Sequence, residues 1–581
     1  MTEIKIIKTD SELQQALQIL TQAEYVGLDT ETTGLDPYTC QLRLIQIGTT
    51  KHTFIIDLFH TPKLAKDLKS ILLAENPIKI LHNAKFDLKM LKHHLGLHVN
   101  SIFDTMLASK VIGGGQEGES HSLAKTVTRF LGIEIDKTEQ TSNWAENNLS
   151  ESQIHYAAQD AIIVCKLYQT QLLKLCNLGL LETAELEFDS VAAIADMELA
   201  GMLLDKEHWQ EIVKETETKH LAVATELRQA LEPGELQMSL FGESTINLDS
   251  PNQVQEALRR LGVPLSDTRS SHLQYLAKEF PILEQLLEYR SLQKALSSYG
   301  LGILKFIHPI TGRIHANFFQ IGTPTGRLSC HEPNLQQIPH SANYRSCFIA
   351  TPGNLLIIAD YSQIELRILA DWADDRVLIN AFQTGADLHC ITASQMFGIA
   401  LSSVTTEHRS AAKQLNYGII YGMGPQGLAN RINRPVAEAE RLIDRYFSTY
   451  SSVAHWLNQA GQEAITNKET RTRLGRLMYV NTSTTEKLSQ SAIIRLGKNM
   501  PIQGTSADIS KYAMMLLYRS LEGTSARLIN NIHDELVFEV ARDKAKSVAK
   551  IIEKEMVAAG QEFIHNVPVL VDIKIAEAWL K

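Results

Sequence analysis

The sequence predicts an α/β unit over about residues 1–180, a helical and highly charged stretch over about 181–305, and a second core of mixed helices and strands beyond Gly312. Three observations predict this order. Short apolar runs alternate with helical patterns in the first part, charged helical patterns fill the middle, and a continuous apolar run at 355–359 opens the last part. A chain of 581 residues is long enough for about four compact units.

The first unit contains short apolar runs that predict strands at 25–28, 44–47, 54–56 and 78–81. Three glycines at 113–115 predict a flexible turn between helices, because no phosphate-binding spacing surrounds them. In the middle stretch, Ser250, Pro251 and Gln253 predict a helix start with a serine N-cap, a proline at the first helical position and a capping-box glutamine.

The apolar run at 355–359 is typical of a strand buried on both faces, and it ends at Asp360. Far downstream, two strand-like runs on either side of His533 and Asp534 predict a tight hairpin with an aspartate at its tip. A carboxylate at the mouth of an apolar strand is costly unless a charged group meets it.

The formal net charge of −10 by itself disfavours a nucleic-acid partner. Residues 405–500, however, hold 13 Lys+Arg and 7 Asp+Glu, a local charge of +6, so the remainder carries −16. This distribution predicts a basic nucleic-acid-binding region on an otherwise acidic protein, and binding of nucleic acid that weakens as the salt concentration rises. Six scattered cysteines without zinc-ligand spacing indicate a reducing compartment, and neither a signal peptide nor a membrane-spanning segment is predicted.

A first set of carboxylates lies in the α/β unit. Asp29 and Glu31 follow an apolar run, and because strand side chains repeat every second residue, they share one face. Asp87 lies farther along, and Tyr156 and Asp160 are spaced to share one face of a helix. A pair of acids at a strand end is by itself often only solvated. A site that gathers more of them needs a cation, and hard oxygen ligands favour Mg²⁺ or Mn²⁺.

In this order, the motifs resemble the 3′–5′ exonuclease domain shared by proofreading DNA polymerases and the ribonuclease D group, over about residues 20–170. The resemblance implies a ribonuclease H-like α/β fold and two Mg²⁺ ions held by Asp29, Glu31, Asp87 and Asp160. It also implies that Tyr156 orients the attacking water. His155 fits the histidine variant of this superfamily, but the following two alanines favour Tyr156.

A stripe of Arg409, Lys413, Tyr417 and Tyr421 recurs every four residues along a predicted helix. Two cations followed by two rings could hold a triphosphate at one end and a sugar and base at the other. The alternative is a surface helix with a half-buried aromatic face.

Together with Asp360 and Asp534, this stripe resembles the polymerase domain of family A DNA polymerases. Similar segments continue at 325–329, 333–336, 387–389 and 503–509, so the two resemblances cover nearly the whole chain. They imply an exonuclease domain at 1–180 and an α+β right-hand polymerase domain at 181–581. Within the latter we expect a thumb at about 205–305, a palm at about 306–375 and 501–581, and fingers at about 376–500.

The resemblance implies template-directed addition of deoxynucleotides to a primer 3′-hydroxyl. Two Mg²⁺ ions, for which Mn²⁺ can substitute, would bind Asp360, Asp534 and the backbone of Tyr361. Glu535 would support this catalytic centre, and Lys413 would protonate the pyrophosphate. The residues expected to bind the nucleotide are Arg409, Lys413, Tyr417, Tyr421, His389, Glu365 and Gln363. Those expected to bind DNA are Arg327, Asn334, Gln336, Arg495, Asn499, Gln503 and His533.

Glu365 resembles the steric gate that excludes a 2′-hydroxyl, which separates this hypothesis from a single-subunit RNA polymerase. Tyr417 stands where many bacterial relatives have phenylalanine, which implies weak discrimination against dideoxynucleotides. Two departures concern the segment at 341–346, which is less basic than the family pattern, and Gln159, which replaces an acidic residue.

Nothing precedes the exonuclease motifs, so we expect no 5′ nuclease. The expected partners are primer-template DNA and deoxynucleoside triphosphates, and not a membrane. We expect a monomer that accessory replication proteins could join, in the cytoplasm at the nucleoid, or in an organelle or host cytoplasm. The main alternative is a ribonuclease D-like RNA-processing exonuclease with an unrelated C-terminal half, and another is a non-enzymatic DNA-binding scaffold. The first leaves Asp360 and Asp534 without a purpose, and the second would be expected to have lost the metal carboxylates.

Overall fold

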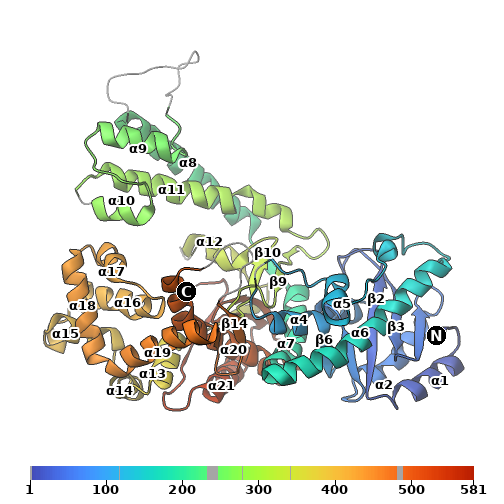
Figure 1. Ribbon diagram of the computed structural model, residues 1–581. Coiled ribbons are helices and arrows are strands. Elements are labelled where there is room, and N and C mark those ends of the chain that lie inside the picture. The colour runs from blue at the N-terminus through green and yellow to red at the C-terminus, as the bar shows by residue number, and fades with distance from the viewer. Residues whose placement is uncertain are drawn as a thin grey trace.

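The computed structural model describes residues 3–116, 118–231, 246–277, 279–339, 342–480 and 488–580. A body built on the N-terminal sheet lies at one end of the molecule, and helices α14 to α18 lie at the other (Figure 1). A helical arm rises from the middle of the molecule. Among the described residues, no helix is both long and apolar enough to span a membrane.

The N-terminal body is a six-stranded sheet in the order β1-β4-β3-β2-β5-β6. Its strands are β1 Glu3–Ile7, β2 Tyr25–Thr32, β3 Leu42–Gly48, β4 His52–Asp57, β5 Ile78–Leu81 and β6 Ile102–Asp104. The helices are α1 Asp10–Leu20, η1 Pro62–Leu68, α2 Lys69–Leu72, α3 Ala84–Leu95, α4 Thr105–Gly113, α5 Leu123–Leu131, η2 Thr138–Thr141 and α6 Glu151–Leu178. The four predicted strands are present, whereas the edge strands β1 and β6 escaped prediction.

Helix α7 (Leu181–Ala200) joins this body to the rest of the chain. Phe188 and Val191 pack in the core of the N-terminal body, whereas Ile194 and Met197 pack in the core of the C-terminal part. One helix therefore contributes to both cores, and the expected boundary at residue 180 falls just before it.

The helical arm has its own core, which includes Leu258, Leu283 and Leu286. Its elements are α8 Lys206–Leu231, α9 Pro251–Arg260, α10 Ser270–Leu276 and α11 Ile282–Tyr299. Ser250 caps α9, with its hydroxyl accepting from the Gln253 amide. The predicted capping box is wrong in one respect, because the Gln253 side chain accepts from the Asn247 amide, 2.8 Å away, and not from that of Ser250.

The central body is a four-stranded antiparallel sheet in the order β15-β16-β12-β17. These strands are β12 Asn354–Tyr361, β15 Arg527–Ile532, β16 Glu535–Ala541 and β17 Val571–Ala576. Around it lie α13 Ile364–Ala373, α14 Arg376–Gln383, α15 Leu388–Phe397, α16 Thr406–Ile420, α17 Pro425–Ile432, α18 Val436–Thr449, α19 Ser451–Asn467, α20 Gln490–Ser520 and α21 Ala545–Phe563. The expected division at 500/501 falls inside α20, which is one continuous helix.

Short elements complete the fold. They are β7 Met202–Leu204, η3 Leu301–Phe306, β8 Arg313–Ile314, β9 Asn317–Phe319, β10 Ser329–His331, η4 Leu335–Gln337, α12 Ala342–Ser346, β11 Phe348–Ile349, η5 Leu401–Ser403, β13 Glu469–Arg471 and β14 Leu477–Tyr479.

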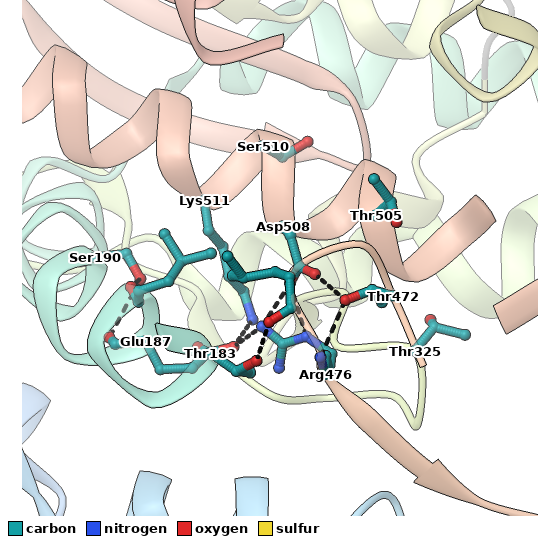
Figure 2. A network of polar contacts seen from close by, with 12 residues as sticks. Thr183, Glu187, Ser190, Thr325, Thr472, Arg476, Thr505, Asp508, Ser510 and Lys511 are labelled. Carbon is teal, nitrogen blue, oxygen red and sulfur yellow. Dashed lines mark hydrogen bonds and ion pairs between the residues drawn. The ribbon is translucent and has the colours of Figure 1, made fainter. Parts of the chain in front are cut away.

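A buried ionic network joins α7 to α20 and to the loop between β13 and β14 (Figure 2). Lys511 and Arg476 lie 2.5 and 2.6 Å from the Glu187 carboxylate, and Arg476 also lies 2.7 Å from Asp508. Burial alone would raise the pKa of Glu187, but the two cations outweigh it and lower the pKa. Arg476 is one of the basic residues counted at 405–500, but its charge is neutralised by Glu187 and Asp508 inside the protein. The count therefore overstated the positive charge that is available to a polyanion.

The glycine turn after α4, predicted as a flexible turn, lies against the β13–β14 hairpin. The Tyr479 amide donates to the Gly114 carbonyl at 2.9 Å. A Cβ on Gly114, whose φ is +55°, would lie 2.7 Å from the Tyr479 ring, and one on Gly115 would lie 3.0 Å from Pro324. The glycines therefore allow the N-terminal body to approach the β13–β14 hairpin closely.

Two candidate active sites

The first candidate site lies where β2 meets α6. One carboxylate oxygen from each of Asp29, Glu31 and Asp160 lies within 4.8 Å of the others, in a set that could hold a metal ion. Alternation along β2 puts Asp29 and Glu31 on one face, as predicted. Helix α6 packs against β2 and contributes the third carboxylate, Asp160. Asp87, from α3, lies outside this close set and accepts a hydrogen bond from the Thr30 hydroxyl at 2.6 Å.

Burial dominates the electrostatics of this cluster. It raises the pKa of Asp29 well above its usual range, and the nearby carboxylates of Asp87, Asp160 and Glu31 add to the effect. The same causes raise the pKa of Glu31 to about 9, and burial raises that of Asp87 to about 7. Such a donor set of hard, crowded oxygens fits a divalent cation, since a cation offsets the repulsion that raises these pKa values.

Lys137, which precedes η2, reaches into the same cluster and was missed in the sequence. Its Nζ lies 2.9 and 2.8 Å from the two carboxylate oxygens of Asp160 and 3.0 Å from the Tyr156 hydroxyl. Its loop position has no periodicity that could have marked it. Tyr156 is buried beside Asp160, whereas His155 is exposed. These positions are consistent with the preference for Tyr156 over His155.

The second candidate site lies at one edge of the central sheet. Asp360 is the second-last residue of β12, and Asp534 lies in the two-residue turn between β15 and β16, as the hairpin prediction required. The Tyr361 amide donates to the Asp534 carbonyl at 3.3 Å, which ties the two segments together. Burial first, and the charge of Asp360 second, raise the pKa of Asp534 to about 7. The two acids thus form a second crowded pair that fits a cation.

Glu535, which was expected to support these acids, is the strand partner of Asp360, and its carboxylate is buried. It is 1% exposed, and its Oε1 accepts from Trp579 Nε1 at 2.8 Å and lies 3.3 Å from Arg345. These contacts put the Glu535 carboxylate under the turn, in the core. Arg345, from the segment at 341–346 that is less basic than the family pattern, is equally buried.

Glu365, on α13, is held from two sides and is 7% exposed. Arg327 lies 2.5 Å from one carboxylate oxygen, and the Tyr421 hydroxyl donates to the other at 2.9 Å. Burial and this carboxylate raise the pKa of Tyr421. Three residues predicted from separate motifs therefore meet in one hydrogen-bonded group.

Helix α16 carries the predicted stripe with one correction, because Tyr421 lies one residue beyond the helix end. Lys413 is exposed, and Arg409 pairs with Asp387 at 2.8 Å. Tyr417 is half-buried, and burial followed by the charge of Asp534 raises its pKa to about 12. Tyr417 of the stripe therefore lies near the carboxylates of the sheet edge.

His389 is less exposed than a phosphate-binding residue is expected to be. It is 4% exposed, its ring Nδ1 lies 2.9 Å from the Asn416 amide nitrogen, and burial lowers its pKa to about 4. At neutral pH the ring therefore carries no charge in this structure.

The candidate DNA-binding residues form two groups, one on α20 and one beside β15. Arg495, Asn499 and Gln503 recur every four residues along α20 and share one face. Within the described chain, Asn499 Oδ1 is buried without a hydrogen-bond partner, and so is Gln363 Oε1 at the start of α13.

In the second group, Gln336 Nε2 donates to the Asn531 carbonyl at 3.2 Å, and the Asn334 side chain accepts from the Gln336 amide. His533 occupies the hairpin turn with φ +58°.

Both parts of the chain match known protein families. The family model for DNA polymerase family A matches residues 217–581, and the model for the 3′-5′ exonuclease matches residues 4–175. DNA polymerase I of Aquifex aeolicus is 32% identical over 607 aligned residues, which cover 100% of both chains. The thermostable DNA polymerase I of Thermus aquaticus is 36% identical over 68% of this chain, which spans 48% of that protein.

A solved structure described as the POL domain of Pol1 from M. smegmatis, in complex with DNA primer-template and dNTP, has a TM-score of 0.85 with this chain. The identity is 28%, and 99% of each chain is covered. The fold is thus an α/β exonuclease domain of the ribonuclease H-like type joined to an α+β right-hand polymerase domain, and domains of both kinds use divalent metal ions. The chain belongs to DNA polymerase family A and is a DNA-directed DNA polymerase that carries a 3′-5′ exonuclease domain.

Proposed function

We propose that this enzyme extends a primer at the edge of the central sheet, with Asp360 and Asp534 as the carboxylates of the synthetic site. The observation that carries the proposal is their meeting at the edge of the central sheet, beside Tyr417 of α16. Paired carboxylates that can hold divalent cations suit a reaction that transfers a negatively charged phosphoryl group. The POL domain of Pol1 from M. smegmatis, solved in complex with DNA primer-template and dNTP, supports these substrates for the present chain.

Each carboxylate set fits divalent cations, and we propose two Mg²⁺ at each site, with Mn²⁺ as a substitute. Asp360, Asp534 and the Tyr361 carbonyl would hold one set, and the four exonuclease acids Asp29, Glu31, Asp87 and Asp160 the other. When bound, such ions lower the pKa of the attacking hydroxyl or water and neutralise the phosphoryl oxygens.

Residues of α16 would bind the incoming nucleotide. Arg409 and Lys413 would pair with the triphosphate, and Lys413, which is exposed, would donate a proton to the leaving pyrophosphate. A neutral His389 would donate a hydrogen bond and not a charge. Tyr417 and Tyr421 would pack against the sugar and the base pair.

Glu365 would act as the wall that excludes a 2′-hydroxyl. Its two partners, Arg327 and Tyr421, fix the carboxylate in place, and a fixed wall discriminates by size better than a mobile one. The DNA contacts would come from Arg495, Asn499 and Gln503 in one group and from Asn334, Gln336 and His533 in the other. Such groups sense base-pair geometry in the minor groove without reading sequence.

The N-terminal site would remove a mispaired 3′ nucleotide. The buried Tyr156 hydroxyl would orient the attacking water. This role needs a hydroxyl that keeps its proton, and the raised pKa of Tyr156 agrees with it. We further propose that the enzyme works as a monomer in the cytoplasm, in DNA replication or repair.

The test uses one primed template and two variants. Asp534→Asn should abolish primer extension and leave 3′ degradation intact, whereas Asp87→Ala should abolish degradation and leave extension intact. Asp543→Asn, an exposed aspartate just after β16, serves as a matched control. Extension by Asp534→Asn at the wild-type rate would show that the synthetic site is assigned wrongly.

A further inference from the structure

The exonuclease cluster already contains a cation of its own. Lys137 Nζ contacts both carboxylate oxygens of Asp160, at 2.9 and 2.8 Å, and lies 4.9 Å from the centre of the Tyr156 ring. Asp29 and Glu31 each place an oxygen within 4.8 Å of an Asp160 oxygen. A bidentate contact engages both oxygens that Asp160 could offer to a metal ion.

The loop that carries Lys137 is fastened to α6. Gln153, in the first turn of α6, donates from Nε2 to the Ser142 hydroxyl at 3.0 Å and to the Asn143 carbonyl at 3.3 Å. The Trp144 ring, farther along, packs 6.4 Å from that of Tyr156. The side chain of Lys137 remains 21% exposed, so a path toward solvent is available. The segment that follows Lys137 is therefore held to α6, while the lysine ammonium group has a route to solvent.

We propose that Lys137 is an internal counter-cation that occupies the metal position at Asp160, and that a divalent ion must displace it to bind. Lys137 then lowers the affinity of the exonuclease site for metal, and it holds the crowded carboxylates together when metal is absent. This inference rests on the proposed metal chemistry of the same site. Lys137 acts here as a positioning residue.

The first experiment measures Mn²⁺ binding by electron paramagnetic resonance. It uses the full chain with Asp360→Asn and Asp534→Asn, so that binding reports on the exonuclease site. Lys137→Met should bind Mn²⁺ at least about tenfold more tightly, because the competing charge is gone. Lys137→Arg should bind near the wild-type level, since it keeps the charge. Lys125→Met, an exposed lysine on α5, should change nothing.

The second experiment measures unfolding temperature in EDTA and in Mn²⁺. Without Lys137 the carboxylates repel one another, so Lys137→Met should lose stability in EDTA and regain it with Mn²⁺, to a greater extent than the wild type or Lys125→Met. Combining Lys137→Met with Asp160→Asn should relieve the loss in EDTA, because one of the repelling charges is removed as well.

Equal or weaker Mn²⁺ binding by Lys137→Met would overturn the inference. That failure is distinct from failure of the proposed function, which would appear as exonuclease activity surviving in Asp87→Ala. If Asp87→Ala is inactive while Lys137→Met binds Mn²⁺ like the wild type, only the counter-cation role is wrong.

Discussion

Neutralising Glu187 should destabilise the junction between the two bodies more than any surface change. Glu187 is 0% exposed and lies 2.5 Å from Lys511 and 2.6 Å from Arg476. With Asp508, these groups form a buried set of two acids and two bases with no net charge. In Glu187→Gln the set keeps both cations but loses one anion, which leaves one uncompensated positive charge out of contact with water.

The expected loss is about 3–5 kcal/mol, the usual effect of removing one partner from a buried ion pair. Balanced removal should cost less than the sum of its parts. In Glu187→Gln/Lys511→Met, the Arg476–Asp508 pair at 2.7 Å survives with no net charge. We therefore expect a coupling energy of at least about 1–2 kcal/mol between Glu187 and Lys511 in a double-mutant cycle.

Thermal unfolding is the appropriate assay, followed by the first transition because a chain with several cores need not unfold in one step. At roughly 2 °C per kcal/mol for large domains, Glu187→Gln should lower the midpoint by about 6–10 °C. Glu182→Gln, on the exposed face of the same helix, should shift it by less than about 1 °C. A midpoint within about 2 °C of the wild type for Glu187→Gln would refute the reasoning, as would strictly additive losses in the cycle.

Two further predictions concern chain termination and pH. Tyr417→Phe should raise the preference for deoxy- over dideoxynucleotides by about tenfold or more, the worth of one hydrogen bond to a hydroxyl, while normal incorporation continues. Competition between the two nucleotides on one primer measures it, and a strong preference already present in the wild type would contradict it. Burial lowers the pKa of His82 from 6.5 to about 3, so between these values the unfolded chain binds a proton that the folded chain does not. Stability should therefore be complete above pH 6.5 and fall by about 2 kcal/mol at pH 5, and His82→Gln should fall less in an acid titration of the unfolding midpoint. An identical pH profile for both proteins would show that another group is responsible.

The strands and helices that carry both sites could be predicted because they obey local rules. Apolar runs marked β2, β5 and β12, and the two-residue period of a strand put Asp29 and Glu31 on one face. The edge strand β6 was missed because three residues give too little periodicity to recognise, and β1 was missed although it is longer than the predicted β5. The family resemblances then assigned exonuclease chemistry to one set of motifs and polymerase chemistry to the other.

The partners of charged side chains were decided by tertiary structure alone. A charge count treats Arg476 as available to DNA, whereas folding buries it against Glu187, a residue of the helix that joins the two bodies. Sequence proximity likewise put Glu535 in support of the catalytic centre, but only the fold decided that its carboxylate contacts Arg345 and Trp579. Lys137, in an irregular loop, meets Asp160 only when that loop folds over α6. Periodicity reports the direction of a side chain within its own element, but an ion pair depends on how two elements distant in sequence pack together.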